Sequence, residues 1–194
     1  MATSQGPIDS DNYTIGGAML YYNATVGNQN CLGTTAFWTA ANNMGNIVTS
    51  EVMPDVTYTE HWRSKNGALV KDKEVVNKKS INITFTFDEM NQNNLRRFLM
   101  GTDSSASKFN VLDNVLEEGC GHLVIKTDVG QDFIYRFPKC TLRPDGALTL
   151  DPESWHEAGF VLNIIEYLNG DCTNSTLNAT WLGMPFGEVD SADL

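Results

Sequence analysis

The sequence predicts a mainly β fold: an antiparallel β-sandwich or barrel with one flanking α-helix, a long inter-strand loop and extended terminal arms. Residues 80–90, SINITFTFDEM, alternate apolar and polar side chains with the period of two that is typical of a half-buried strand. Residues 89–100 carry the apolar spacing of an amphipathic helix. Other apolar segments are short, rich in β-branched and aromatic residues, and separated by Gly and Pro turn signals. Together these segments fit one domain spanning residues 1–194.

The first half of the chain begins with polar residues 1–13, which predict an N-terminal arm. Strands are expected within residues 13–26 and again within residues 45–54. Pro54 lacks a backbone N–H and is expected to end the pairing of the second strand. Residues 55–72 are then predicted to form a long loop. Such loops are uncommon in compact domains and usually have a function, a flexible excursion without one being the alternative.

The predicted helix follows the alternating strand and covers residues 89 to about 100. Asp88 or a neighbour is expected to cap its N-terminus, and Gly101 is expected to end it in the left-handed conformation. The side chains at positions i, i+3 and i+4 form one apolar stripe that should pack on the sheet, namely Leu95, Phe98 and Leu99.

The second half of the chain predicts a hairpin, because GHLVIKTDVG and QDFIYRFPKCTL lie on either side of Gly130. Residues 156–168, HEAGFVLNIIEYL, are largely apolar and predict a strand that is buried on both faces. Residues 170–194 predict an extended C-terminal arm with two apolar anchors, Trp181-Leu182 and Pro185-Phe186.

Charge is distributed unevenly along the chain, which has a formal net charge of −11 from 13 basic and 24 acidic residues. This balance argues against a protein that grips nucleic acid, because phosphates require Lys and Arg. The basic residues gather in residues 61–79, which contain six Lys and Arg against Asp72 and Glu74. Residues 144–194 contain no Lys or Arg. This polarity predicts that one end of the molecule meets a partner resembling its own other end.

A search for chemistry finds no nucleotide-binding loop, no nucleophile motif and no metal-ligand spacing. The carboxylate pairs Asp88-Glu89 and Glu117-Glu118 are adjacent in sequence, so their side chains are expected to point apart rather than face one cleft. The prediction is therefore a protein that is not an enzyme, with no catalytic residue, no cofactor and no metal. The four cysteines are widely spaced and are expected to be free thiols, namely Cys31, Cys120, Cys140 and Cys172.

No apolar run approaches the length that crosses a membrane, and the N-terminus lacks the basic start and apolar stretch of a signal peptide. Synthesis in a cytoplasm is expected from these two features, with no membrane partner.

Several segments, taken in order from about Gly16 to Gly187, resemble the major tail tube proteins of long-tailed bacteriophages. The resemblance lies in an acidic/His/Arg motif, a Gly-containing loop, a basic strand, an alternating strand end and a short helix. The matching segments are YTEHWR, GALVKDKEVV, INITFTFDEM, NLRRFLMG, CTLRPDGALTL, VLNII and MPFG. The C-terminal residues from Asp171 to Leu194 depart from the pattern of that family.

The resemblance implies a β-sandwich-like fold with a flanking helix, shared with the inner tube of type VI secretion. It also implies six copies in a ring and rings stacked into a hollow tube through which DNA passes without specific binding. The implied partners are other copies of the chain, the tape measure protein, the tail terminator and the distal tail proteins. The implied location is the virion, assembled in the bacterial cytoplasm.

Two groups of residues receive roles under this hypothesis. The basic segment is expected to contact the next ring, with the long loop and both arms ordering on assembly. The small polar face of the alternating strand is expected to line the lumen, or else to lie under the helix or a neighbouring subunit. The inter-ring residues are His61, Trp62, Arg63, Lys65, Lys71, Lys73, Lys78 and Lys79, and the lumen residues are Asn82, Thr84, Thr86 and Asp88.

Two alternatives remain open from the sequence. One is a β-sandwich binding module that recognises carbohydrate or a host surface through Trp62, Trp155 or Trp181. The other is a related neck or terminator protein of the tail that forms a single ring and stops.

Overall fold

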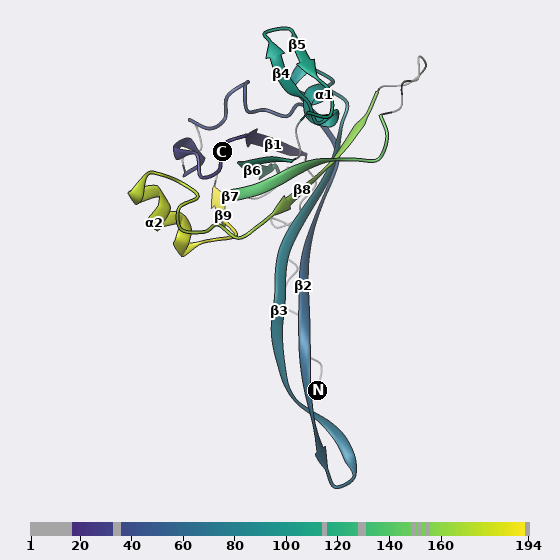
Figure 1. Ribbon diagram of the computed structural model, residues 1–194, viewed down its shortest axis with the longest axis vertical. Helices are drawn as coiled ribbons and strands as arrows, with labels where there is room; N and C mark the ends of the chain where they lie inside the picture. The colour runs from purple at the N-terminus through teal and green to yellow at the C-terminus, as the bar shows by residue number, and fades with distance from the viewer. Residues whose placement is uncertain are drawn as a thin grey trace, which may run out of the picture.

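The computed structural model describes residues 17–32, 36–113, 116–127, 131–148, 150, 153 and 156–192, and it is built on one seven-stranded antiparallel sheet (Figure 1). The strand order is β1-β6-β7-β8-β3-β2, with β9 paired to β7, and β4 and β5 form a separate hairpin. The elements are β1 (Ala18–Asn23), η2 (Gln29–Leu32), β2 (Ile47–Lys65), β3 (Ala68–Phe87), α1 (Gln92–Phe98), β4 (Thr102–Ser105), β5 (Lys108–Asn110), β6 (Glu117–Ile125), β7 (Asp132–Asp145), β8 (Ala158–Ile164), α2 (Ser175–Gly183) and β9 (Glu188–Ala192).

The sheet curls until its two outer strands approach each other. β1 and β2 lie at opposite ends of the strand order, yet they contact one another. The chain just before β2 pairs with β1 through a bridge between Tyr21 and Asn43. The Met44 amide also donates to the Leu20 carbonyl at 2.9 Å. The predicted mainly β antiparallel fold with a flanking helix is confirmed.

Each face of the sheet carries its own apolar cluster. The inner cluster contains stacked aromatic rings on β3 and β8, with Phe87 and Phe160 at a centroid distance of 4.9 Å. Phe98 of α1 meets Phe160 edge-on at 5.8 Å, so the helix covers this face. The outer cluster includes Phe37 and Trp181, both fully buried, and lies between the sheet, the segment around η2, and α2. The predicted hairpin of β6 and β7 and the doubly buried strand β8 are both present.

Helix α1 is shorter than predicted and its caps differ. Asn91, rather than Asp88, caps the N-terminus, and its side chain accepts a hydrogen bond from the Asn94 amide at 2.9 Å. Met100 adopts the left-handed conformation with φ 49°, whereas Gly101 does not. Gly101 is needed for space instead, because a Cβ there would lie 2.6 Å from the Phe109 ring and 2.7 Å from the Asn110 carbonyl oxygen. Phe98 packs on the core as predicted, while Leu95 and Leu99 are half-buried.

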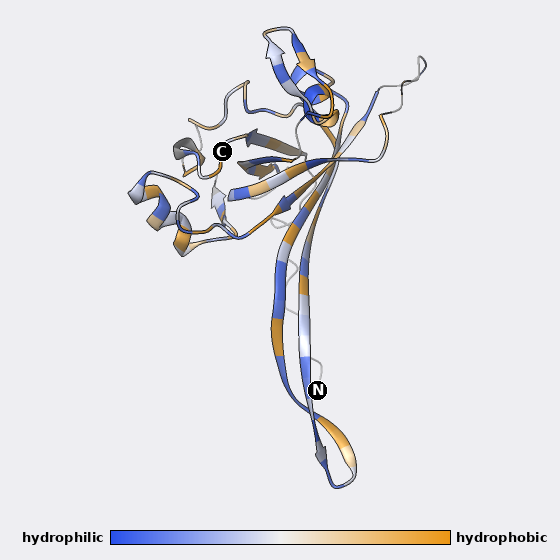
Figure 2. Ribbon diagram, viewed as in Figure 1, coloured by the Kyte–Doolittle hydropathy of each residue, from blue (hydrophilic) through white to orange (hydrophobic). Residues whose placement is uncertain are grey.

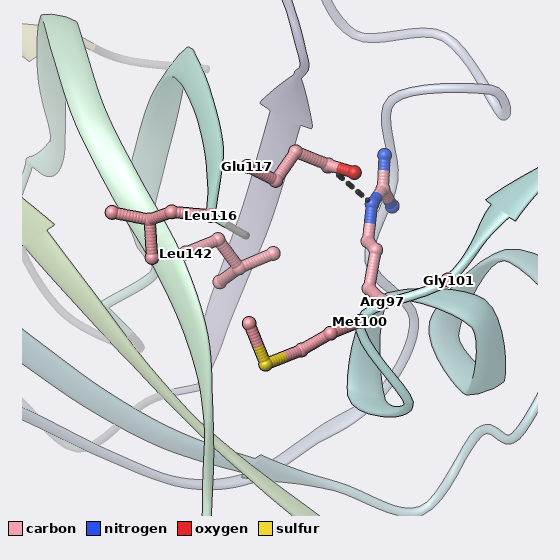
Figure 3. A pocket seen from close by; sticks show the side chains of 6 residues that line it. All are labelled: Arg97, Met100, Gly101, Leu116, Glu117 and Leu142. Carbon is pink, nitrogen blue, oxygen red and sulfur yellow. Dashed lines mark hydrogen bonds and ion pairs between the residues drawn. The ribbon is translucent and has the colours of Figure 1, made fainter. Parts of the chain in front are cut away.

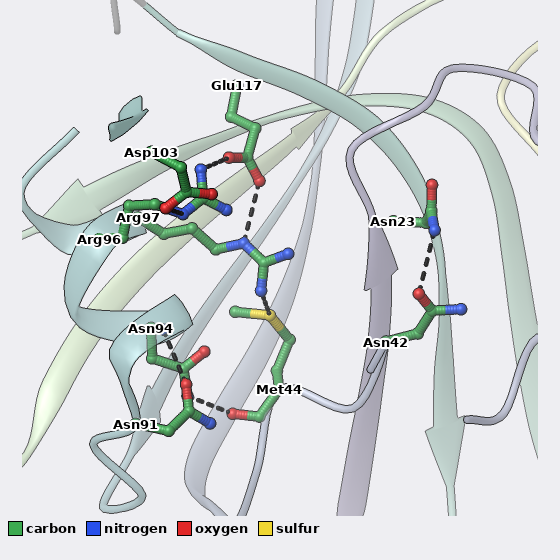
Figure 4. Close-up of polar contacts among 9 residues, drawn as sticks. All are labelled: Asn23, Asn42, Met44, Asn91, Asn94, Arg96, Arg97, Asp103 and Glu117. Atoms are coloured by element: carbon green, nitrogen blue, oxygen red, sulfur yellow. Dashed lines mark hydrogen bonds and ion pairs between the residues drawn. The ribbon is translucent and has the colours of Figure 1, made fainter. Parts of the chain in front are cut away.

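The residue of α1 that the apolar pattern missed is Asn94, which is 1 % exposed. Its side-chain amide donates to the Met44 carbonyl at 2.8 Å (Figure 4). The same amide donates to the Glu89 carbonyl at 2.9 Å. Two otherwise unpaired backbone acceptors are thereby satisfied, and the start of the helix is fixed to the segment before β2.

Arginines in the last turn fasten α1 to β6. Arg97 donates to the Glu117 carboxylate at 3.0 Å, and its guanidinium lies 5.1 Å from the centre of the Tyr22 ring (Figure 4). Arg96 lies 3.5 Å from the same carboxylate. These arginines therefore bind a neighbouring strand in addition to lying near the C-terminal end of the helix dipole.

The predicted loop at residues 55–72 is wrong: these residues belong to β2 and β3, which form one long antiparallel hairpin. Pro54 does not end the pairing, because β2 is an edge strand and the missing N–H of a proline is tolerated on an edge. The hairpin turns at Asn66 and Gly67, both with positive φ (51° and 82°), which is the geometry that an Asn-Gly pair favours.

The extended C-terminal arm predicted for residues 170–194 is also wrong over the part that the structure describes. Asn174 caps helix α2, and β9 pairs with β7 from Asp132↔Ala192 to Arg136↔Glu188. The anchor at Trp181 is fully buried, as an anchor should be, but it lies in a helix. The predicted N-terminal arm, residues 1–13, lies outside the described residues.

Replacing Asn94 by Ala should lower the free energy of unfolding by about 2 kcal/mol, because the buried Met44 carbonyl and the partly buried Glu89 carbonyl lose their donor. Asn93→Ala is the matched control, since Asn93 is exposed in the same helical turn and its loss should change stability by less than about 0.5 kcal/mol. Chemical denaturation measures both. Equal stabilities for the two variants would contradict the role assigned to Asn94.

His122 on β6 is the buried histidine of the outer cluster. Its Nε2–H donates to the Cys31 carbonyl at 2.7 Å, and its Nδ1 accepts from the Trp38 indole N–H at 3.1 Å. The bond from Trp38 requires the neutral ring, because a protonated imidazolium has no nitrogen that can accept. Burial, with a smaller contribution from the Arg136 charge, lowers the pKa of His122 to about 4.

Because the unfolded chain binds a proton at the ordinary histidine pKa and the native ring does not, stability should fall as pH drops from about 6.5 to about 4. The contribution of His122 over this window is about 3 kcal/mol. His122→Gln should be less stable at pH 7 and should lose less stability on acidification, while His156→Gln, at an exposed position, should follow the unmodified protein. Thermal melts across this range test it, and parallel curves for all three proteins would refute the assignment.

Candidate assembly surface

The part of β2 and β3 that leaves the body is the main candidate for function, and we call residues 48–79 the arm. Every residue from Val48 to Lys79 is exposed. At about 3.3 Å per residue, the β2 side of the arm extends roughly 60 Å. Its base pairs with the part of β3 that is bound to β8, so the free ribbon begins at about Asp55 and is roughly 36 Å long on the β2 side. Figure 1 shows it projecting from the sheet as a two-stranded ribbon along the longest axis of the molecule.

The two faces of the arm differ in character. From Thr49 onward the side chains of β2 alternate, and the even-numbered face carries Val52, Pro54, Val56, Tyr58 and Trp62. We call this set the apolar face of the arm. Figure 2 shows apolar and polar segments alternating along the ribbon.

The apolar face continues the interior of the body. Cross-strand partners share a face, and Val52 pairs with Ile83, which is fully buried, while Pro54 pairs with Ile81. Farther along, nothing in the described chain covers this face, so Tyr58 is 53 % and Trp62 50 % exposed. A two-stranded ribbon is marginally stable by itself, and this face of the ribbon is left open in the described chain.

The opposite face of the arm is mostly polar and carries charged networks near its tip. Asp72 accepts from His61 at 2.6 Å and lies 3.7 Å from Arg63. Met53, Val70 and Val75 are the apolar exceptions on this face.

A second network lies on the apolar side of the tip. Lys71 binds Glu60 at 2.6 Å and also contacts Glu74, and the Trp62 indole N–H donates to Glu60 at 3.1 Å. The hydrogen bond from Lys71 lowers the pKa of Glu60, and the bonds to Glu60 and Glu74 raise the pKa of Lys71. These are exposed pairs, so they hold the tip in shape more than they stabilise it.

The net positive charge of the arm is smaller than residues 61–79 alone indicate. The window 61–79 misses the acidic residues of β2, and the arm as a whole carries six Lys and Arg against five Asp and Glu. Among the predicted inter-ring residues, those with no ion pair in the described part of the chain are Lys65, Lys73, Lys78 and Lys79.

The acidic C-terminal segment is also partly neutralised within the chain. Arg136 binds Glu188 at 2.8 Å and Asp190 at 3.0 Å, and Lys139 binds Asp171 at 2.9 Å. These three carboxylates are therefore paired with cations of the same chain. Fewer carboxylates in residues 144–194 are left to pair with the lysines of the arm than the sequence predicts.

The residues predicted to line a lumen lie on the outer, polar face of β3. Thr84 and Thr86 border an open groove together with Thr49, Glu51 and Asp145. α1 packs on the inner face through Phe98, so this helix does not cover the groove. Asp88 follows the end of β3, and its carboxylate accepts from the Asn46 amide at 2.9 Å.

Asn82 extends the polar row beyond the groove. It pairs across the strands with Asn163 of β8, and the side-chain oxygens of both residues are buried without a hydrogen-bond partner in the described chain.

A small cavity is present in the part of the chain that the structure describes. The cavity between α1, β6 and β7 measures about 10 Å³, near the lower limit for one water, and is lined by Arg97, Met100, Gly101, Leu116, Glu117 and Leu142 (Figure 3). No group of three or more His, Cys, Asp or Glu among the described residues is placed to hold a metal ion.

The cysteines and tryptophans singled out by the sequence differ in burial. Cys31, Cys120 and Cys140 are buried free thiols, and burial raises the pKa of Cys31 and Cys140. Trp181 is buried and unable to contact a ligand, whereas Trp62 is exposed on the arm. Trp155 lies outside the described residues. No described helix has both the length and the apolarity needed to cross a membrane.

The sequence contains the signals for the arm that the prediction of a loop overlooked. Residues 54–59 alternate apolar and polar side chains, and Asn66-Gly67 is a strong hairpin signal. Pro54 does not outweigh these signals, because an edge strand tolerates proline.

Comparison with known families finds one match. A family described as protein of unknown function UCP028589 matches residues 32–128, half of the chain, and the match contains the whole arm. No curated protein matches the sequence.

In the unassembled chain, backbone amides in residues 52–64 should exchange with solvent much faster than those of β6 and β7. The reason is that the arm has two strands and no covering layer, so it opens locally at low cost. Hydrogen exchange with mass spectrometry measures the difference. Protection in the arm equal to that of β7 would show that the arm is stabilised within one chain.

Proposed function

The chain belongs to the UCP028589 family, and we propose that it is a non-enzymatic structural protein that assembles with copies of itself into the tail tube of a long-tailed bacteriophage. Six copies form a ring, and the rings stack into a hollow tube that conducts genomic DNA. The protein is then part of the virion, and its partners are further copies, the tape measure protein, the tail terminator and the distal tail proteins.

The observation that carries the proposal is the uncovered apolar face of the arm. Val56, Tyr58 and Trp62 lie on a ribbon that is far from the body and is too thin to bury them. Aromatic residues of this kind supply much of the energy of protein interfaces. A partner that repeats along an axis explains an arm about as long as the body that bears it.

Head-to-tail stacking fits the geometry. A heterologous contact needs two different surfaces on one molecule, and repeated contacts of this kind produce a ring or a filament. The arm occupies one end of the longest axis, and α1 with the β4–β5 hairpin occupies the other (Figure 1).

The polar outer face of β3 supports the part of the proposal in which DNA passes through the tube. The groove bordered by Thr84, Thr86, Glu51 and Asp145 carries small hydroxyls and carboxylates, and the chain has a net charge of −11. Duplex DNA has about one phosphate charge per 1.7 Å, so a basic lumen would retain it and a weakly acidic lumen would let it slide.

A binding module is the second candidate, and exposed Trp62 is the observation in its favour. Burial of Trp181 removes one of the three tryptophans from which a glycan-binding surface was expected. A neck or terminator protein would use the same surfaces and stop after one ring.

The test compares two substitutions on adjacent residues of β2 that point to opposite faces. Tyr58→Asp places a charge on the apolar face, and Thr57→Asp places the same charge on the polar face. Tyr58→Asp should raise the concentration needed for assembly roughly thirtyfold, the effect of losing an interface anchor worth about 2 kcal/mol. Thr57→Asp should assemble like the unmodified chain.

Negative-stain electron microscopy of the concentrated protein gives the readout. Uniform hollow tubes from the unmodified chain and from Thr57→Asp, with none from Tyr58→Asp, are the expected result. Single rings would favour the neck or terminator protein. Monomers at every concentration, together with binding in a glycan screen, would favour the binding module.

A further inference from the structure

We propose that the apolar face of the arm docks on a specific surface at the opposite end of a second copy: Met100, Val111, Leu112 and Leu116, which we call the α1 patch. The inference rests on the proposed self-assembly and adds the surface that receives the arm. That surface differs from the acidic C-terminal segment that the charge distribution alone indicated.

The α1 patch gathers apolar side chains from three segments around the end of the helix. Val111 is 55 %, Leu112 76 % and Leu116 42 % exposed. The Leu112 amide donates to the Leu99 carbonyl at 3.0 Å, which places Leu112 beside the last turn of α1. Leu116 and Met100 line the same small cavity (Figure 3), so the two sides of the patch meet.

Leu112 is an unusual residue for a free surface. Its φ is 57°, in the left-handed region that leucine seldom adopts, and Asn or Asp would fit there with less strain. A strained leucine that is three-quarters exposed gives the isolated chain no packing in return. Its apolar side chain makes physical sense when a second molecule covers it.

The arm is the occupant that matches this patch in place and charge. The patch and the tip of the arm lie at opposite ends of the longest axis, as a head-to-tail contact requires (Figure 1). The free part of the ribbon is about 36 Å long and about 10 Å wide, so one of its faces offers roughly 360 Å² for a contact.

The charges beside the two surfaces are opposite. Asp113 and Glu118 flank the patch, are exposed, and form no ion pair in the described chain. On the arm, Lys79 lies opposite Val56 on the apolar face and is likewise without an ion pair there. Opposite charges at the rim of an apolar contact fix its register.

Other exposed apolar residues are the competitors for the arm. The clearest is the pair Phe133 and Val189 on β7 and β9, which are 37 % and 65 % exposed. They lie on the body, on the opposite face of β7 and β9 from the ion pairs of Arg136, so no carboxylate of those pairs lies beside them to align an arm.

The first experiment compares Leu112→Asp with Val189→Asp as the matched control. Leu112→Asp should keep or raise the melting temperature, since Asp tolerates the left-handed conformation, and should raise the concentration needed for assembly at least tenfold. Val189→Asp should assemble normally. Normal assembly of Leu112→Asp, or loss of assembly in Val189→Asp alone, overturns the proposal.

A second measurement tests the contact directly. Tyr58→Cys and Leu112→Cys are made as separate proteins in a Cys172→Ser background, the other three cysteines being buried. After assembly of the mixture, a bismaleimide should produce covalent dimers that neither variant yields alone. Assembled protein with no dimers in the mixture refutes the α1 patch and leaves the proposed function standing. Failure of the unmodified chain to assemble at any concentration refutes both.

Discussion

A two-stranded ribbon cannot bury either of its faces, and this constraint organises the molecule. In the body, β2 and β3 belong to a curled seven-stranded sheet whose inner face is filled by rings such as Phe85, Phe87 and Phe160. The same strands run on past the sheet with the same alternation, so the interior pattern continues onto a surface without a second layer. The body buries its apolar side chains, and the arm carries the same alternation outward onto an exposed ribbon.

The body is arranged to hold the base of the arm firmly. β3 is paired on one side with β8 and on the other with β2, and the segment before β2 is fixed to β1 and to the Asn94 side chain of α1. A rigid base matters because a small rotation there is multiplied along a free ribbon of about 36 Å. The network of Arg97, Glu117 and Tyr22, which ties α1 to β6, serves the same end.

The fold class, the alternating strand at 81–87 and the doubly buried β8 were predictable, since side-chain period reports directly on burial. The arm was predictable in principle from the alternation of its residues and from the turn signal Asn66-Gly67. Alternating apolar residues normally indicate a strand that packs on a core, and an exposed hairpin is an exception to that rule. Helix α2 was not predictable, because its residues STLNATWLG show no apolar stripe and only Trp181 is buried. The ion pairs of Lys71 depend on which residues of β2 lie opposite β3, and this register is set by three register shifts that no sequence rule locates.

Residues 61–79 stand out by their charge, yet apolar contact is the stronger basis for the proposed assembly. Exposed ion pairs contribute little free energy, and the tip uses several of its charges on itself, through Asp72 and through Glu60 with Glu74. The remaining lysines lie at the rim, where charge governs register and the rate of encounter. A contact held by apolar area and aligned by charge can form only with a copy in the correct orientation, and such a contact lets one subunit repeat along an axis.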